Sequence, residues 1–121
     1  VLVGDAFGFI DPIYSSGVYF AMKSGLLASD AIVAGLQVDD VSGKQLGSWI
    51  PEYSEGTQWI RKLVDAYYVH PFSFGQFLKM HPQYTGALTD LLIGRIFHDG
   101  AGRIFDDMDP AIQAAITGKH E

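Results

Sequence analysis

The spacing of apolar residues predicts a chain built mainly of α-helices. A first helix is expected from a cap at Ser15 or Ser16 to about Leu36. Its apolar positions are Val18, Met22, Leu26, Ile32 and Leu36. Small residues recur beside them at Gly17, Ala21, Gly25, Ala28 and Gly35. Because this stretch carries few charges and many small residues, we expect the helix to be mostly buried against another segment.

A second apolar stripe follows a polar linker at residues 38–43. It runs at helical period over residues 46–67, with most charged side chains elsewhere on the helix. Pro51 should kink this helix or mark a new start, because proline lacks an N–H group and clashes with the preceding turn. The helix should stop near His70, since Pro71 disfavours helical geometry in the residue before it.

Two shorter helices are predicted next. Ser73 and Gln76 form a capping-box pattern, which predicts a helix that ends at residues 81–82. Thr85 is the expected cap of another helix, which should end at Gly100.

The two ends of the chain complete the expected fold. Asp109 before Pro110 is typical of a helix start, and Gly118 of a helix stop. Residues 1–3 are an apolar run that predicts the end of a buried strand already under way. The fold class expected for the chain is therefore mainly α, with a short N-terminal β-strand followed by five or six helices.

Composition narrows the class of protein. The 121 residues are 48 % hydrophobic and 18 % charged, which is typical of an ordered chain, and the length suits one domain. The formal net charge of −6, without a basic cluster, argues against nucleic acid and anionic membranes as partners. The absence of cysteine excludes disulfides and favours a cytoplasmic location, and no apolar run is long enough for a membrane span.

The main candidate site is the polar stretch that leads into the first helix. Gly4 allows close backbone approach by a ligand, and Asp5 can accept hydrogen bonds from sugar-like hydroxyl groups. The helix start at Gly17 presents free N–H groups and the positive end of the helix dipole. Taken alone, the same residues also fit a strand, an Asx-type turn and an ordinary capped helix.

The run GDAFGFIDPIYSSGVYFAMKSGLLASDAI resembles the second flavin-binding motif of FAD-dependent oxidoreductases. The superfamily concerned contains the p-hydroxybenzoate hydroxylase-like monooxygenases, the geranylgeranyl reductases and the flavin-dependent halogenases. The GDA…DP…SSGV form is most similar to the halogenase branch and its non-halogenating relatives. Residues 61–79 are more loosely similar to the helical C-terminal part of that branch.

The resemblance implies a role for each position of the motif. It assigns flavin contacts to Gly4, Asp5, Ala6, Pro12, Ser16, Gly17 and Val18. Asp5 would bind the ribityl chain, and Pro12 would lie against the isoalloxazine ring. The backbone N–H groups at the start of the helix would face the pyrimidine edge, where reduced flavin carries negative charge. Ser16 and Gly17 are also candidate halide contacts, and no residue of this chain is assigned as catalytic.

The resemblance also implies what a complete protein would contain. Residues 1–38 would belong to an α/β FAD-binding domain, and residues 39–121 to a helical C-terminal region. The dinucleotide-binding half with its G-x-G-x-x-G turn is absent from these residues. FAD and a small-molecule, hydrophobic substrate are the implied partners, and hydroxylase, reductase and halogenase activities all stay open. We expect the 121 residues alone to be inactive and to bind FAD weakly.

Other chemistry is less favoured by the sequence. The four histidines, His70, His81, His98 and His120, match no metal-ligand spacing. A serine nucleophile at Ser15 or Ser16 lacks the first glycine of a nucleophile elbow.

The aromatic residues and the absence of a complete flavin site leave alternatives open. Aromatic side chains at helical spacing predict a plain core or a hydrophobic substrate pocket. They are Trp59, Tyr67, Tyr68, Phe72, Phe74 and Phe77. An exposed apolar face would favour self-association. The alternative function is a stand-alone helical interaction module without a cofactor.

Overall fold

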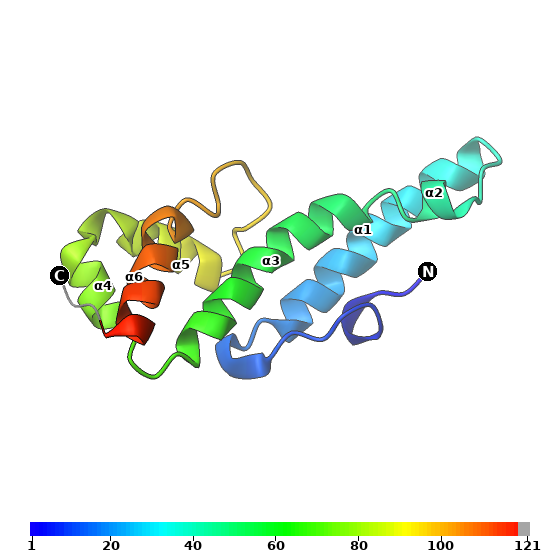
Figure 1. Ribbon diagram of the computed structural model, residues 1–121. Helices are drawn as coiled ribbons and strands as arrows, with labels where there is room; N and C mark the ends of the chain where they lie inside the picture. The colour runs from blue at the N-terminus through cyan, green and yellow to red at the C-terminus, as the bar shows by residue number, and fades with distance from the viewer. Residues whose placement is uncertain (119–121) are drawn as a thin grey trace. The chain divides into compact units, whose positions relative to one another are not determined.

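The computed structural model describes residues 1–118 and is almost entirely helical (Figure 1). The α-helices are α1 (Gly17–Gln37), α2 (Gly43–Leu46), α3 (Ile50–Tyr67), α4 (Phe74–Met80), α5 (Thr85–Leu92) and α6 (Phe105–Thr117). Short 3₁₀ helices lie at Gly4–Ala6, Pro12–Tyr14 and Pro82–Tyr84. The chain divides into two compact units, unit 1 (Val1–Thr57) and unit 2 (Gln58–Glu121), which are described separately below.

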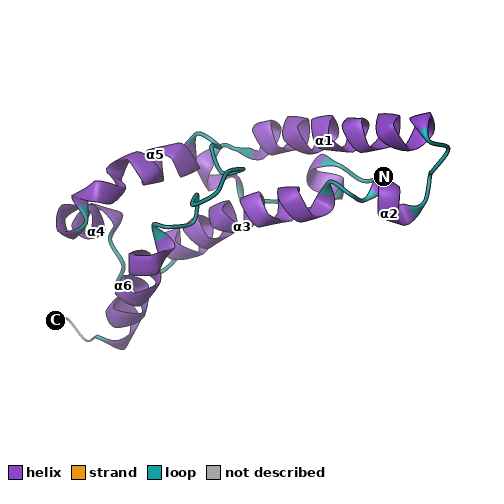
Figure 2. Ribbon diagram, turned by 90° about the horizontal axis from the view of Figure 1, so that it is seen from above, coloured by secondary structure: helices purple, strands orange, loops and turns teal. Residues whose placement is uncertain are grey.

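The predicted N-terminal strand is wrong for this chain. Residues 1–118 contain no β-strand, as the colouring by secondary structure makes plain (Figure 2). The backbone of Val3 is extended, with φ −137° and ψ 166°, but residues 1–3 are exposed and have no ladder partner among the described residues. A strand is stabilised by hydrogen bonds to a neighbouring strand, so three extended residues alone do not form one. The α/β fold expected for a complete protein therefore stays a prediction.

Unit 1 is built on α1. The N-terminal segment runs back alongside this helix (Figure 1), and the short helix α2 is tied to it by a hydrogen bond from Gln45 Nε2 to the Ala31 carbonyl (3.0 Å). An aromatic cluster joins Phe7 to the residues around the start of α3. The Phe7 ring lies 5.1 Å from that of Trp49 and 5.7 Å from that of Tyr53.

The expectation that α1 is mostly buried is wrong for its larger apolar residues. The buried residues of the helix are Phe20, Ser24, Ala28, Ala31 and Gly35, a stripe of mainly small side chains. Another face exposes Val18, Met22, Leu26, Val33 and Leu36, each by more than half. The small residues form the face of α1 that packs closely, whereas the larger apolar residues lie on another face of the helix and stay exposed. No helix within residues 1–118 is long and apolar enough to cross a membrane.

Unit 2 contains an aliphatic core. Its largest fully buried side chains are Ile60, Leu63, Leu91, Ile96, Ile104 and Met108. The predicted capping box before α4 is confirmed at its serine, because Ser73 Oγ accepts the Gln76 N–H at 3.3 Å. The helix ends at Met80, with His81 as its C-cap, as predicted.

The end of α5 and the start of α6 differ from those predicted from the sequence. α5 stops at Leu92, and Gly94 with φ +83° lies in the turn that follows, so the helix ends well before Gly100. α6 begins at Phe105 and contains Pro110, so the predicted start at Asp109 is wrong. Two carboxylates in the first turn favour this earlier start through the helix dipole, and proline removes only one hydrogen bond there. The predicted stop is confirmed, since Gly118 adopts φ +67°.

Candidate functional site

Gly4 is fixed against α1 by a buried serine. Its N–H group donates to Ser24 Oγ at 2.8 Å, and Ser24 in turn donates to the Ala21 carbonyl at 3.0 Å. The φ of Gly4 is +58°, and a Cβ atom there would lie 3.2 Å from Ala21 Cβ. Both the left-handed backbone and the close approach favour glycine. The result is a fixed turn that presents Asp5 and Ala6, both exposed, to the outside.

Pro12 begins a second turn between Gly4 and α1. Asp11 Oδ1 accepts the Ile13 N–H at 3.1 Å, so this carboxylate has a structural role at the N-terminus of the turn. The Ser15 N–H donates to the Pro12 carbonyl at 2.8 Å, and Ser15 itself is left-handed, with φ +56°. Pro12 stays exposed at the surface of unit 1.

Ser16 occupies the N-cap position of α1 but does not cap the helix. Its φ of −97° and ψ of −3° are helical, whereas capping serines usually have an extended backbone. The residue is only 7 % exposed, and its Oγ atom has no hydrogen-bond partner in the described part of the chain. A buried hydroxyl without a partner is unfavourable by about 1–3 kcal/mol. Ser16 is therefore suited to bind a group that the chain itself does not supply.

The first turn of α1 is open to a ligand. An α-helix leaves its first N–H groups without intrahelical partners, and they carry a partial positive charge. Apart from its chain neighbours and the backbone of its own helix, no atom of the described residues lies within 4 Å of a Cβ atom built on Gly17, and Val18 is 74 % exposed. The Ser24 anchor of Gly4 lies seven residues into α1, which is roughly 10 Å along the helix axis. Gly4 thus packs beside the second turn of α1, and Ser16 and Gly17 begin the same helix.

The histidines show no metal centre. Residues 1–118 contain no group of three or more His, Cys, Asp or Glu side chains arranged to hold a metal ion, and His120 lies outside the described residues. The Nδ1 atom of His98 lies 3.0 Å from the Asp99 carbonyl oxygen, and its Nε2 atom lies 3.0 Å from that of Arg95. His70, His81 and His98 belong to unit 2, and Ser15 and Ser16 belong to unit 1.

The aromatic residues divide between core and surface. Phe77 is buried, and the Trp59 ring stacks on that of Phe105 with centroids 5.7 Å apart. Tyr67 and Tyr68 are both more than half exposed.

The hydrogen-bonded pair Tyr84 and Asp107 in unit 2 was not predicted from the sequence. The Tyr84 hydroxyl donates to Asp107 Oδ2 at 2.8 Å, and this hydrogen bond to a carboxylate raises the pKa of Tyr84 above its ordinary value of 10.0. The two residues are 23 positions apart and belong to no local motif.

Several known proteins that are similar to most of this chain are named as halogenating enzymes. A 1H-pyrrole-2-carbonyl-(peptidyl-carrier protein) chlorinase of Pseudomonas fluorescens is 30 % identical over 114 residues, which is 94 % of this chain and 25 % of the relative. The corresponding brominase of Pseudoalteromonas luteoviolacea is 35 % identical over 96 residues, 78 % of this chain and 23 % of the relative. Flavin-dependent halogenase armH1 of Armillaria mellea is 30 % identical over 112 residues, 93 % of this chain and 19 % of the relative.

The aligned residues make up most of this chain but only a small share of each relative. The chain spans about a quarter of the length of the first two relatives and less of the third. No protein-family model and no solved structure matches it. The similarity nevertheless extends over most of the chain, well beyond the GD…DP…SSG motif. The chain is therefore a sequence relative of the flavin-dependent halogenases, in agreement with its resemblance to that branch of the FAD-dependent oxidoreductases.

Proposed function

We propose that this chain is the C-terminal portion of an FAD-dependent oxidoreductase and contributes the ribityl and isoalloxazine side of the flavin site. The observation that carries the proposal is the buried, unpartnered Ser16 hydroxyl at the start of α1. The relatives support the cofactor, because armH1 is named as flavin-dependent and is similar over 93 % of this chain. The complete enzyme would therefore use FAD.

The residues of unit 1 fit such a cofactor in three respects. The Ser16 hydroxyl can donate to, or accept from, a polar atom of the flavin ring, which would remove the penalty for its burial. The open first turn of α1 offers N–H groups and a positive dipole to the ring edge that becomes negative on reduction. The fixed Gly4 turn leaves Asp5 exposed to accept hydrogen bonds from the ribityl hydroxyls.

The spacing of the motif along α1 also suits a flavin. The start of α1 and Ser24, which fixes the Gly4 turn, are separated by roughly 10 Å along the helix axis, so a ligand that contacts both regions must be elongated. Asp5 and Ala6 would contact the ribityl chain, while Pro12, Gly17 and Val18 would contact the ring system. Bound flavin supplies the redox chemistry, and these residues supply position and electrostatics. None of them is proposed as an acid, a base or a nucleophile.

The reaction that we propose for the complete enzyme rests on the names of its relatives. Halogenation is the first candidate, because the chlorinase, the brominase and armH1 all carry that activity in their names. Hydroxylase and reductase activities share the same flavin motif and are the next candidates. The substrate would be a small molecule, and a cytoplasmic location stays a prediction from the absence of cysteine.

An Asp5→Ala variant of the complete protein tests the cofactor site. Loss of hydrogen bonds to a charged group should weaken FAD binding by about ten-fold or more, measured as flavin released into a dilution series. Asp30→Ala is the matched control, because Asp30 is an exposed aspartate on α1 that is not among the residues assigned to flavin contacts. Equal flavin retention in Asp5→Ala, Asp30→Ala and the unmodified protein would favour the alternative of a helical interaction module without a cofactor.

A further inference from the structure

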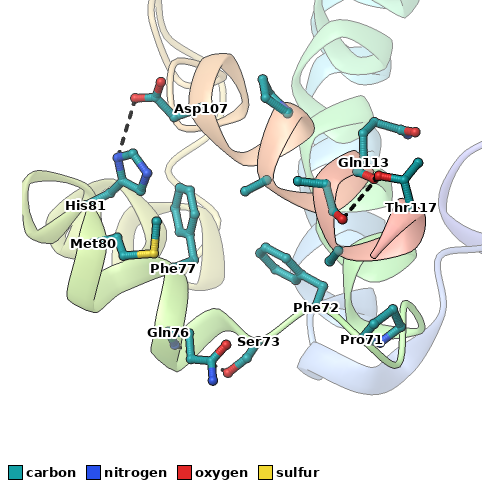
Figure 3. Close-up of a pocket in the computed structure, with 14 residues that line it drawn as sticks. Pro71, Phe72, Ser73, Gln76, Phe77, Met80, His81, Asp107, Gln113 and Thr117 are labelled. Carbon is teal, nitrogen blue, oxygen red and sulfur yellow. Dashed lines mark hydrogen bonds and ion pairs between the residues drawn. The ribbon is translucent and has the colours of Figure 1, made fainter. Parts of the chain in front are cut away.

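A pocket of about 600 Å³ opens in unit 2 between α4 and α6 (Figure 3). Its volume is within the range of about 300–1,000 Å³ that is usual for small-molecule sites. All its lining residues belong to unit 2, and none of them belongs to the flavin motif of unit 1. Neither the sequence similarity nor the flavin proposal assigns it a ligand.

Large apolar side chains line the α4 side of the pocket, and alanines together with Gln113 and Thr117 line the α6 side. Phe72 and Phe77 point from the α4 side toward α6, with ring centroids 6.0 Å apart and planes tilted by 48° (Figure 3). Opposite them, α6 presents Ala111 and Ala114. Short side chains on α6 leave room in front of the rings. This arrangement suits an aromatic or alkyl body, because apolar surface and ring faces would cover it on two sides.

A carboxylate marks one end of the pocket. Asp107 Oδ2 accepts the Tyr84 hydroxyl at 2.8 Å and lies 3.8 Å from His81 Nδ1. In the described part of the chain, Asp107 Oδ1 has no hydrogen-bond partner. The residues that line the pocket include no other carboxylate and neither lysine nor arginine. The pocket therefore combines an apolar floor with a single negative group that can still accept a hydrogen bond.

We propose that this pocket binds a small molecule with an aromatic or alkyl body and a cationic amine. The body packs between the two phenylalanine rings and α6, and the amine donates to Asp107. An anionic ligand of the same shape is disfavoured, because its charge would meet the carboxylate at short range. The proposal stands independently of the flavin site.

A pair of probes of similar size and opposite charge tests the ligand class. We expect the complete protein to bind 2-phenylethylamine at least about ten-fold more tightly than 3-phenylpropionate in calorimetric titrations. Equal affinity for the two probes, or tighter binding of the carboxylate, would overturn the proposal. Absence of amine binding would overturn it as well.

Two pairs of variants locate the binding. Asp107→Asn keeps an oxygen that can accept from Tyr84 but removes the charge, and should weaken amine binding about ten-fold. Asp106→Asn, at an exposed neighbour outside the lining, should change it less than two-fold. Equal effects of the two substitutions would place the amine elsewhere and contradict the proposal.

The second pair fills the pocket. Ala114→Trp should abolish amine binding, whereas Ile116→Trp, an exposed position of α6 outside the lining, should preserve it. Amine binding that survives Ala114→Trp contradicts the proposal. Should Ala114→Trp prevent folding, as seen by circular dichroism, the Asp107 and Asp106 variants decide the question. FAD content, measured on the same samples, reports separately on the flavin proposal.

Discussion

The two units bury different kinds of residues. The largest side chains with less than 2 % exposure are six apolar residues of unit 2 and the polar Ser24 of unit 1. Unit 2 thus owes its stability to aliphatic packing, whereas unit 1 buries a serine that fixes the Gly4 turn and leaves an apolar face of α1 exposed. Exposed apolar faces of that kind mark surfaces that bind another body.

This difference separates the stability of the chain from its binding function. Burial of aliphatic side chains is the main source of stability in folded proteins, and unit 2 has more of it. In unit 1, polar groups are positioned at a helix start and one of them, Ser16, has no partner among the described residues. Substitutions in the aliphatic core of unit 2 should therefore act on unfolding, and those at the flavin-contact residues assigned in unit 1 should act on the cofactor.

The largest difference is expected between two leucines. Leu63→Ala removes a side chain that is fully buried in unit 2 and should lower the free energy of unfolding by about 2–5 kcal/mol, because it leaves a cavity. Leu26→Ala alters an exposed position of α1 and should change it by less than about 0.5 kcal/mol. Urea denaturation of the chain measures both values, and similar losses for the two variants would contradict the comparison.

A second pair of substitutions concerns the serine that anchors Gly4. Ser24→Ala leaves the buried Gly4 N–H without an acceptor and should destabilise the chain by about 1–3 kcal/mol. Ser29→Ala is the control, since Ser29 also donates to the carbonyl three residues earlier on α1 but is exposed. It should cost less than about 0.5 kcal/mol in the same denaturation experiment. The account would be wrong if the control were as destabilising as Ser24→Ala.

A comparison of two N-cap serines, Ser16 and Ser73, sharpens the contrast further. Ser73→Ala removes the hydrogen bond that caps α4 and should cost about 1 kcal/mol of stability. Ser16→Ala removes no capping bond and removes an unpartnered buried hydroxyl, so it should stabilise the chain by about 1–3 kcal/mol, while FAD binding by the complete protein weakens. Thermal unfolding and flavin retention measure the two effects. Loss of stability without loss of flavin in Ser16→Ala would assign Ser16 a structural role only.

The smallest effect concerns Tyr84 in unit 2. Its hydrogen bond to Asp107 raises the pKa of Tyr84 in the folded chain above 10.0, so the bond stabilises the fold fully below pH 10.0. This contribution is lost as the pH rises through the folded-state pKa. A Tyr84→Phe variant should therefore lack a component of the tyrosinate absorbance that appears above pH 10.0 in an alkaline titration. If its titration curve loses an early component instead, the hydrogen bond does not form in solution.

The sequence predicted the local features of the fold well. The Ser73 cap and the Gly118 stop depend on neighbouring residues and were both confirmed. The start of α6 was missed, because Asp109 and Pro110 look like a helix start while the carboxylates of the preceding turn stabilise an earlier one. The strand at residues 1–3 was wrong, because a strand depends on a partner that these residues do not contain.

The candidate site was predictable only in part. The motif located the turns and the first residues of α1, since their spacing is local. The anchoring of Gly4 by Ser24, 20 positions away, and the lack of a capping bond at Ser16 depend on tertiary packing. The same holds for the cluster of Tyr84 and Asp107, which no local pattern marks.

The central claim is that the motif of unit 1 binds flavin, and a crystal structure of the complete protein with FAD tests it most directly. We predict a ribityl hydroxyl within hydrogen-bond distance of the Asp5 carboxylate and a polar ring atom within the same distance of Ser16 Oγ, at about 2.5–3.2 Å. Flavin bound elsewhere, with Asp5 and Ser16 facing solvent or protein, would contradict the account.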